Sequence, residues 1–242
     1  MPTGNSHSEY QLVPTHFGLR MTVGTLGLAI PILLFLTSAL APGVAQQPSI
    51  SHYYYTPMRD ALMGALFAVA VFLLAYRGYR PLDGEWLTDR RLSLIAGCGL
   101  IAVVVMPAAA IPGLGHPGDI PSLAAFFSPR IVLVAWIHRI GAALFMGALG
   151  IMSLVNFRRD RFAPRYSAGL PAHVRAEHLV FVGAGVAMLG AVALIALEFA
   201  LGPGGEFFAN STFWLESLGV FSFGCAWVTK TKILRKLIGT GG

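Results

Sequence analysis

The sequence predicts an all-α fold, a polytopic transmembrane bundle of six helices with both termini in the cytoplasm. The first observation is composition: 55% of the 242 residues are hydrophobic, only 12% are charged, and the mean hydropathy is +0.68. A soluble domain of this size needs far more charge to cover its surface. The other two observations are six long apolar segments and an alternation of basic and base-free loops between them.

Each of these segments has about the 20 mainly apolar residues that a helix needs to cross the hydrocarbon core of a bilayer. The segments are roughly 20–42, 57–77, 92–112, 130–156, 178–201 and 211–230. No internal repeat is evident, and the remaining segments are too short for a separate soluble domain. We therefore expect residues 1–242 to form a single integral membrane domain.

The ends of some spans carry local signals. The first span is followed by Gly43-Val44-Ala45, which resembles a signal-peptidase site. Its apolar run is about 20 residues long, against roughly 7 to 15 in a secretory signal peptide, so we expect the span to be retained. Thr56 and Pro57 suit the cap and first turn of the second span. Residues 202–205 are expected to form the turn before the last span.

Small residues within the spans predict packing rather than chemistry. Cys98 and Cys225 both lie in apolar segments, so we expect buried thiols and neither a disulfide framework nor a thiolate metal site. Glycines in the fourth and fifth spans are expected to allow close contact between helices. These glycines are Gly147, Gly150, Gly183, Gly185 and Gly190.

The orientation follows from the arginine and lysine content of the loops, because cytoplasmic loops are enriched in both. Residues 43–56, 113–129 and 202–210 contain neither, so these loops are expected outside. The basic residues, which give a net charge of +6, form short clusters in the other connections and in the tail, a placement typical of topology signals rather than of a nucleic-acid surface. The clusters are Arg77, Arg80, Arg90 and Arg91; Arg158, Arg159, Arg161, Arg165 and Arg175; and Lys230, Lys232, Arg235 and Lys236.

Ionisable residues within the spans fall in one leaflet. At about 1.5 Å per residue, His138 and Arg139 lie on the order of 12 Å below the outer end of the fourth span. Arg59, Asp60, Glu198 and Glu216 also lie near outer ends, and the inner halves hold almost nothing ionisable. Buried charges are costly unless paired, so we expect these groups to offset one another. Other polar or aromatic residues expected at the same face are Ser51, His52, Tyr53, Tyr54, Tyr55, His116 and Trp214.

These residues predict a polar site. His138, Asp60 and Glu216 are the candidate catalytic residues, because an intramembrane histidine beside carboxylates can act as a general acid or base. Candidate ligand-binding residues are Ser51, His52, Arg59, Arg139 and Glu198. His138 could bond to Glu216 or Ser51, or hold a metal with His52 and a carboxylate; no HxxxH or HExxH pair supports a metal, and the cofactor stays open. Two alternatives are ion pairs that fix helix register and, for Tyr53–Tyr55, an interfacial aromatic belt.

Three stretches of the chain resemble a known family. They are "SISHYYYTPMRDALMGALFAVAVFLLAYRGYR", "WIHRIGAALF" and "FWLESLGVFSFGCAWVTK". They resemble an uncharacterised six-span bacterial membrane protein family, a domain of unknown function, which implies a multi-pass protein of the bacterial inner membrane. Ser49, Ser51 and Glu216 give a more distant similarity to the Frag1/DRAM/Sfk1 group, which implies lipid handling. A third comparison is with the zinc-dependent ceramidases and adiponectin receptors. Those proteins have seven spans and paired histidines, and this chain lacks both features.

Three functions remain open from the sequence. The first is binding or handling of a lipid head group, since the arginine fork suits phosphate and an outer-leaflet site suits lipid entry. The second is a membrane-embedded lipid hydrolase, with or without a metal. The third is a small-solute or proton transporter, which is expected to continue polar residues through the inner half. Membrane lipids are the expected partners; no nucleic acid or soluble partner is indicated, and the oligomeric state stays open.

Overall fold

The computed structural model describes residues 6–79, 81, 84–108, 131–158, 172–202 and 204–231. Over these residues the protein is helical and has no strand. The elements, in order, are α1 (Ser6–Leu40), η1 (Ser51–Tyr55), α2 (Arg59–Ala75), α3 (Asp89–Val105), α5 (Ile131–Ile151), η4 (Met152–Asn156), α6 (Ala172–Leu201) and α7 (Ser211–Lys230). Here η1 is a 3-10 helix and η4 a π-helical turn that continues α5.

Three of these helices are long and apolar enough to cross a membrane. They are Phe17–Leu40, Val132–Asn156 and Val174–Leu201. The all-helical fold expected from the sequence is therefore confirmed, and membrane-crossing capacity is shown for these three segments. α2 and α3 have 17 residues each, slightly fewer than the expected spans.

The third helix differs most from its expected bounds of 92–112. It begins earlier, at Asp89, because the side chain of Thr88 caps it by accepting the Arg91 backbone N–H at 3.2 Å. It ends earlier, at Val105, because Pro107 disfavours helical backbone in the residue before it and lacks the N–H that a further turn requires. The backbone carbonyl of Met106 is thereby left outside the helix.

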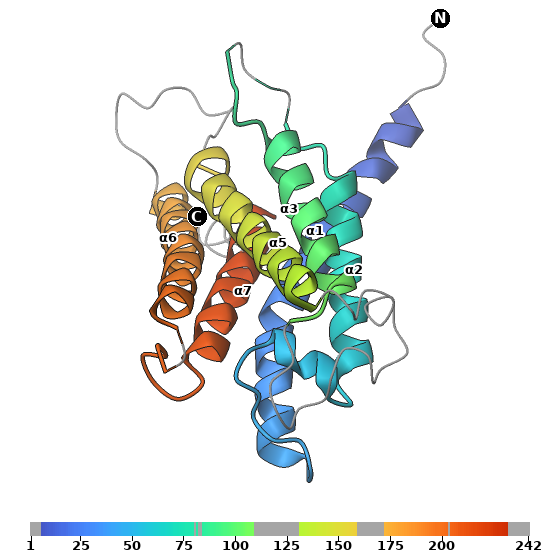
Figure 1. Ribbon diagram of the computed structural model, residues 1–242. Coiled ribbons are helices and arrows are strands. Elements are labelled where there is room, and N and C mark those ends of the chain that lie inside the picture. The colour runs from blue at the N-terminus through green and yellow to red at the C-terminus, as the bar shows by residue number, and fades with distance from the viewer. Residues whose placement is uncertain are drawn as a thin grey trace, which may run out of the picture.

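Helix α5 lies between α3 and α6 and contacts both (Figure 1). It meets α3 where Gly99 and Gly141 lie together, and a Cβ at Gly141 would come within 2.6 Å of the Gly99 carbonyl oxygen. It meets α6 at Gly150 and Gly185, as expected from the sequence. Gly147, Gly183 and Gly190 have nothing within 4 Å of a Cβ position, so the close contacts expected there are wrong.

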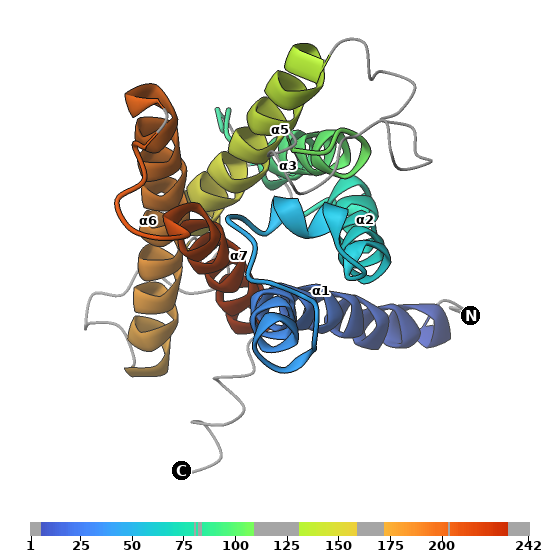
Figure 2. The same cartoon turned by 60° about the horizontal axis from the view of Figure 1, so that its bottom comes forward.

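From the Gly150–Gly185 contact, α5 and α6 diverge toward the end of the bundle at which α5 begins and α6 ends (Figure 2). η1 lies across that end, between α2 and α7. Its Tyr53 and Tyr54 are 0% and 4% exposed, and the Tyr53 hydroxyl hydrogen bonds with Ser38. These two tyrosines are therefore packed inside the protein, and the interfacial belt is the wrong interpretation for them.

Tyr55 also has a specific partner, because its hydroxyl donates to the Ala108 carbonyl at 2.8 Å. Burial, with a smaller contribution from Tyr54, raises the pKa of Tyr55 to about 12, so the phenol keeps its proton at neutral pH. The three tyrosines thus fix η1 in place.

Cys98 and Cys225 are both free thiols. Cys98 is exposed and Cys225 is partly exposed, so the expectation that both thiols are buried is wrong.

Candidate functional site

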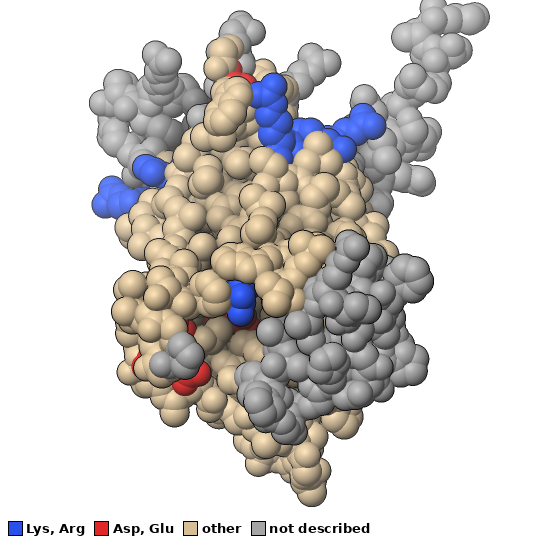
Figure 3. Space-filling view, in the orientation of Figure 1, with Lys and Arg blue, Asp and Glu red and all other residues tan. Residues whose placement is uncertain are grey.

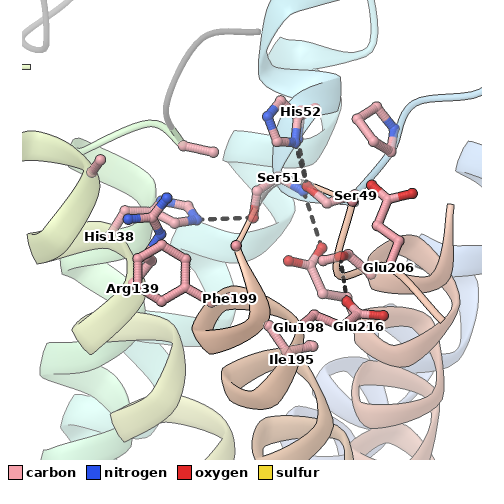
Figure 4. Close-up of a pocket in the computed structure, with 16 residues that line it drawn as sticks. Ser49, Ser51, His52, His138, Arg139, Ile195, Glu198, Phe199, Glu206 and Glu216 are labelled. Carbon is pink, nitrogen blue, oxygen red and sulfur yellow. Dashed lines mark hydrogen bonds between the residues drawn. The ribbon is translucent and has the colours of Figure 1, made fainter. Parts of the chain in front are cut away.

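A polar cavity of about 360 Å³ opens at the end of the bundle where η1 lies (Figure 4). Its walls come from the segment before η1, from η1 itself, from α5, and from α6, α7 and the connection between them. In Figure 3, acidic side chains are visible within a hollow on the drawn face, with a basic side chain at its edge. The titratable residues that line the cavity are His52, His138, Arg139, Glu198, Glu206 and Glu216.

His138 is the most specifically held of these residues. It is 6% exposed, and its Nδ1 lies 2.6 Å from the Met106 carbonyl oxygen that the early end of α3 leaves free. Its Nε2 lies 3.0 Å from Ser51 Oγ, the first side chain of η1. Of the partners that the sequence allowed for His138, Ser51 is the one observed.

The roles in this chain of hydrogen bonds follow from its two ends. A carbonyl oxygen can only accept, so His138 Nδ1 carries the proton and donates it. In the neutral ring the other nitrogen is then an acceptor, and Ser51 donates its hydroxyl proton to Nε2. The arrangement therefore points the lone pair of a buried imidazole at a serine hydroxyl.

Ser51 also connects the histidine to the carboxylate on the opposite wall. Its backbone N–H donates to Glu216 Oε2 at 3.3 Å, across 165 residues of sequence. Glu216 lies in the second turn of α7, at the depth expected from the sequence. The structure thus brings His138, Ser51 and Glu216 together, as Figure 4 shows.

His52 faces the cavity from the next position of η1. Its Nδ1 lies 2.6 Å from Ser49 Oγ, which also accepts the His52 backbone N–H at 3.2 Å. Ser49 is only 3% exposed. This pair is local, three residues apart, and it fixes the backbone that presents Ser51.

Glu198 lies in the wall, but its carboxylate is already occupied. It accepts hydrogen bonds from the hydroxyls of Ser211 and Thr212, the latter at 2.8 Å, and from the backbone N–H of Phe207 at 3.4 Å. Ser211 and Thr212 form the first turn of α7, where a negative charge is favourable. Glu198 therefore joins the end of α6 to the start of α7.

Arg139 lies at the edge of the cavity, and its guanidinium packs over two aromatic rings. Its guanidinium carbon is 4.1 Å from the centroid of the Phe199 ring and 5.7 Å from that of Trp136. Within the described parts of the chain, no hydrogen bond or ion pair occupies the Arg139 guanidinium. The offsetting of Arg139 by Glu198 or Glu216 that we expected is therefore wrong, and its donors face the cavity.

Arg59 and Asp60 lie elsewhere, although the sequence places them at the same depth. The Arg59 guanidinium carbon is 5.0 Å from the Tyr54 ring centroid, and Asp60 is exposed. Neither residue lines the cavity. The structure therefore does not place Asp60 in the cavity with His138 and Glu216, the other two candidate catalytic residues.

A second hollow adjoins the polar cavity. It is a groove of about 320 Å³ between α5 and α6, lined almost wholly by apolar side chains such as Ile140, Met146 and Val192. The groove and the cavity share five lining residues, which are His138, Arg139, Ile195, Phe199 and Glu216. The two hollows therefore meet at His138 and Arg139.

A metal centre has no support in the described parts of the chain, where no three His, Cys, Asp or Glu side chains come close enough to hold an ion. The expected outer loop 113–129, with His116, lies outside the described residues. Three groups of the site were not predicted from the sequence. They are the Met106 carbonyl, Phe199 and Glu206. Pro107, inside an expected span, was the signal that could have revealed the first.

The chain was compared with family models, with curated proteins and with solved structures, and none of them matches. The site must therefore be interpreted from its own geometry.

Proposed function

We propose that the protein is a six-span membrane protein that binds one lipid, with the head group in the polar cavity and an acyl chain in the groove between α5 and α6. One observation carries this proposal: a polar cavity and an apolar groove adjoin and share five residues. An amphiphile is the class of ligand that fills two such hollows at once, because its two ends need opposite surroundings.

The charges of the cavity favour a head group that carries both signs. Arg139 offers guanidinium donors, which suit a phosphate, whereas Glu206 and Glu216 can face an amine or a quaternary ammonium. Glu198 is not counted, because Ser211, Thr212 and Phe207 occupy it. A zwitterionic phospholipid meets these requirements better than an anionic one.

The location in the bilayer is part of the proposal. Basic side chains gather at the end of the molecule opposite the cavity, the upper end in Figure 3. Cytoplasmic ends are enriched in Lys and Arg, which supports an outer-leaflet cavity in a multi-pass protein of the bacterial inner membrane. We also propose that the protein belongs to the six-span family that its sequence resembles. A more distant relationship to the Frag1/DRAM/Sfk1 group is part of the same proposal.

Arg139→Gln tests the head-group site. Removal of a charged hydrogen-bond partner costs about 1.5 to 3 kcal/mol, so binding of a fluorescent phosphatidylcholine to the protein in detergent should weaken roughly 10- to 100-fold. Arg59→Gln is the matched control, because Arg59 also lies on an aromatic ring but does not line the cavity. Equal binding by both variants would contradict the proposal.

A further inference from the structure

We infer that Ser51 and His138 are a nucleophile and its general base, and that the site hydrolyses a carboxylic ester of the bound lipid. This inference rests on the proposed lipid site and names the bond that is broken there. It differs from the carboxylate-centred chemistry expected from the sequence, because the reacting group is the hydroxyl of η1.

The first argument is the direction of the hydrogen bonds. Serine is a weak nucleophile until an adjacent base takes its proton, and the base must be oriented by a third group. Here Nε2 of His138 lies 3.0 Å from Ser51 Oγ, and the Met106 carbonyl, 2.6 Å from Nδ1, orients the ring. A backbone carbonyl thus takes the place that a carboxylate has in a Ser-His-Asp triad.

The second argument is location. His138 lines both the polar cavity and the apolar groove, and Ser51 lines the cavity beside it. In a phospholipid, the acyl ester lies between the acyl chain and the phosphate. A lipid with its chain in the groove and its phosphate near Arg139 has that ester at the junction, within the wall that contains His138.

A second serine and histidine line the cavity, and they fit the role less well. Ser49 is 3% exposed, and its Oγ already accepts the backbone N–H of His52. Ser51 is half-buried, and among the described residues its hydroxyl hydrogen bonds with His138 alone. We therefore assign the nucleophile to Ser51 and not to Ser49, and locating the serine that a reactive probe modifies tests this assignment.

The reaction balances with water as the co-reactant. Ser51 Oγ attacks the ester carbonyl carbon while its proton moves to His138 Nε2, and the carbonyl oxygen becomes negatively charged. When this tetrahedral intermediate collapses, the ester C–O bond breaks and the alcohol leaves with the proton from His138 Nε2. The acyl group stays on Ser51. Water then attacks this acyl ester, again giving a proton to Nε2, and the fatty acid leaves as the proton returns to Ser51 Oγ. Arg139 is the only Lys or Arg among the described lining residues and supplies positive charge to the cavity.

A fluorophosphonate probe tests the nucleophile on the full-length protein in mild detergent. The probe forms a covalent bond with activated serines, and peptide mass spectrometry locates the adduct. We expect the adduct on Ser51. Labelling should be lost in Ser51→Ala and slowed at least about 100-fold in His138→Ala, since a positioned general base contributes about that much.

Ser217→Ala is the matched control, because Ser217 is buried in α7, makes no hydrogen bond with its hydroxyl among described residues and does not line the cavity. It should be labelled, at Ser51, as the wild type is. No adduct on the folded wild-type protein, or an adduct on Ser49 or any other residue, would overturn the inference. This mapping needs no variant, so misfolding of Ser51→Ala cannot leave the question open.

The two proposals fail separately. If the wild-type protein binds phosphatidylcholine but Ser51 is not labelled, the protein is a lipid-binding protein and the esterase inference is wrong. If Ser51 is labelled but Arg139→Gln binds phosphatidylcholine as the wild type does, the head-group proposal is wrong and the nucleophile stands. Release of fatty acid from mixed micelles of phosphatidylcholine and detergent by the wild type, but not by Ser51→Ala, supports both.

Discussion

At the scale of single residues, two neighbouring carboxylates have different roles. Glu198 accepts three hydrogen bonds from the first turn of α7 and the segment before it, whereas Glu216 accepts the backbone N–H of Ser51 in η1. The sequence placed both residues near the outer ends of their spans and predicted a catalytic role for Glu216 and a ligand-binding role for Glu198. Their partners separate them, and they assign Glu198 to structure and Glu216 to the site.

Glu198→Ala should destabilise the protein by about 2 to 3 kcal/mol, because it removes a charged acceptor and leaves the buried Ser211 hydroxyl without it. Thermal unfolding in detergent measures the loss. Glu206→Ala is the comparison, since an exposed side chain should change stability by no more than about 0.5 kcal/mol. A Glu198→Ala protein as stable as Glu206→Ala would show that the α6–α7 join does not depend on this carboxylate.

Depth along a helix is the part of the site that the sequence could predict. Counting residues from the ends of the expected spans grouped Ser51, His52, His138, Arg139 and Glu216 at one face, and in the structure these residues line one cavity. It could not exclude Arg59 and Asp60, because depth does not say which way a side chain points around its helix. In the structure, η1 is held by its buried tyrosines with Ser51 at the cavity, whereas Asp60, in the first turn of α2, is exposed.

At the scale of helices, the positions of glycine and proline decide where the hollows form. Pro107 ends α3 early and frees the Met106 carbonyl for His138. Gly150 and Gly185 let α5 and α6 touch, and the groove lies on the diverging side of that contact. The sequence predicted helices and a helix-contact role for some glycines, but which glycines face a neighbour depends on packing that a single helix does not reveal.

Gly185→Ala should disturb this contact. A Cβ there would lie 2.5 Å from Leu154 Cγ and 2.9 Å from the Gly150 carbonyl oxygen, so the helices must shift, at a cost of about 1 to 3 kcal/mol. Gly183→Ala, two positions away on α6, has nothing within 4 Å and should be neutral or slightly stabilising. Equal melting temperatures for the two variants would contradict the packing of α5 on α6.

At the scale of the whole molecule, asymmetry between the two ends is the main feature. One end carries most of the described Lys and Arg side chains, and the other carries η1 and the cavity with its acidic side chains (Figures 1 and 3). The sequence predicted this asymmetry from loop composition, because topology signals are local. It could not predict the groove, which exists only when α5, α6 and α7 are assembled.

Cysteine accessibility tests the proposed orientation. In a background with Cys98→Ala and Cys225→Ala, Ala45→Cys should react with a membrane-impermeant maleimide in intact spheroplasts. Trp86→Cys, in the basic connection between α2 and α3, should react only after permeabilisation. Both positions are exposed, so burial does not confound the comparison. The reverse pattern would place the cavity at the cytoplasmic face.

Photo-crosslinking of a bound lipid tests the central claim most directly. A phosphatidylcholine with a photoreactive group in the middle of one acyl chain is incubated with the purified protein, irradiated and mapped by mass spectrometry. We predict adducts on the groove walls, at residues 136–146 of α5 and 191–199 of α6, and competition by unlabelled phosphatidylcholine. Adducts spread over the outward faces of α1 and α2, or insensitive to competitor, would contradict a lipid site at the meeting of cavity and groove.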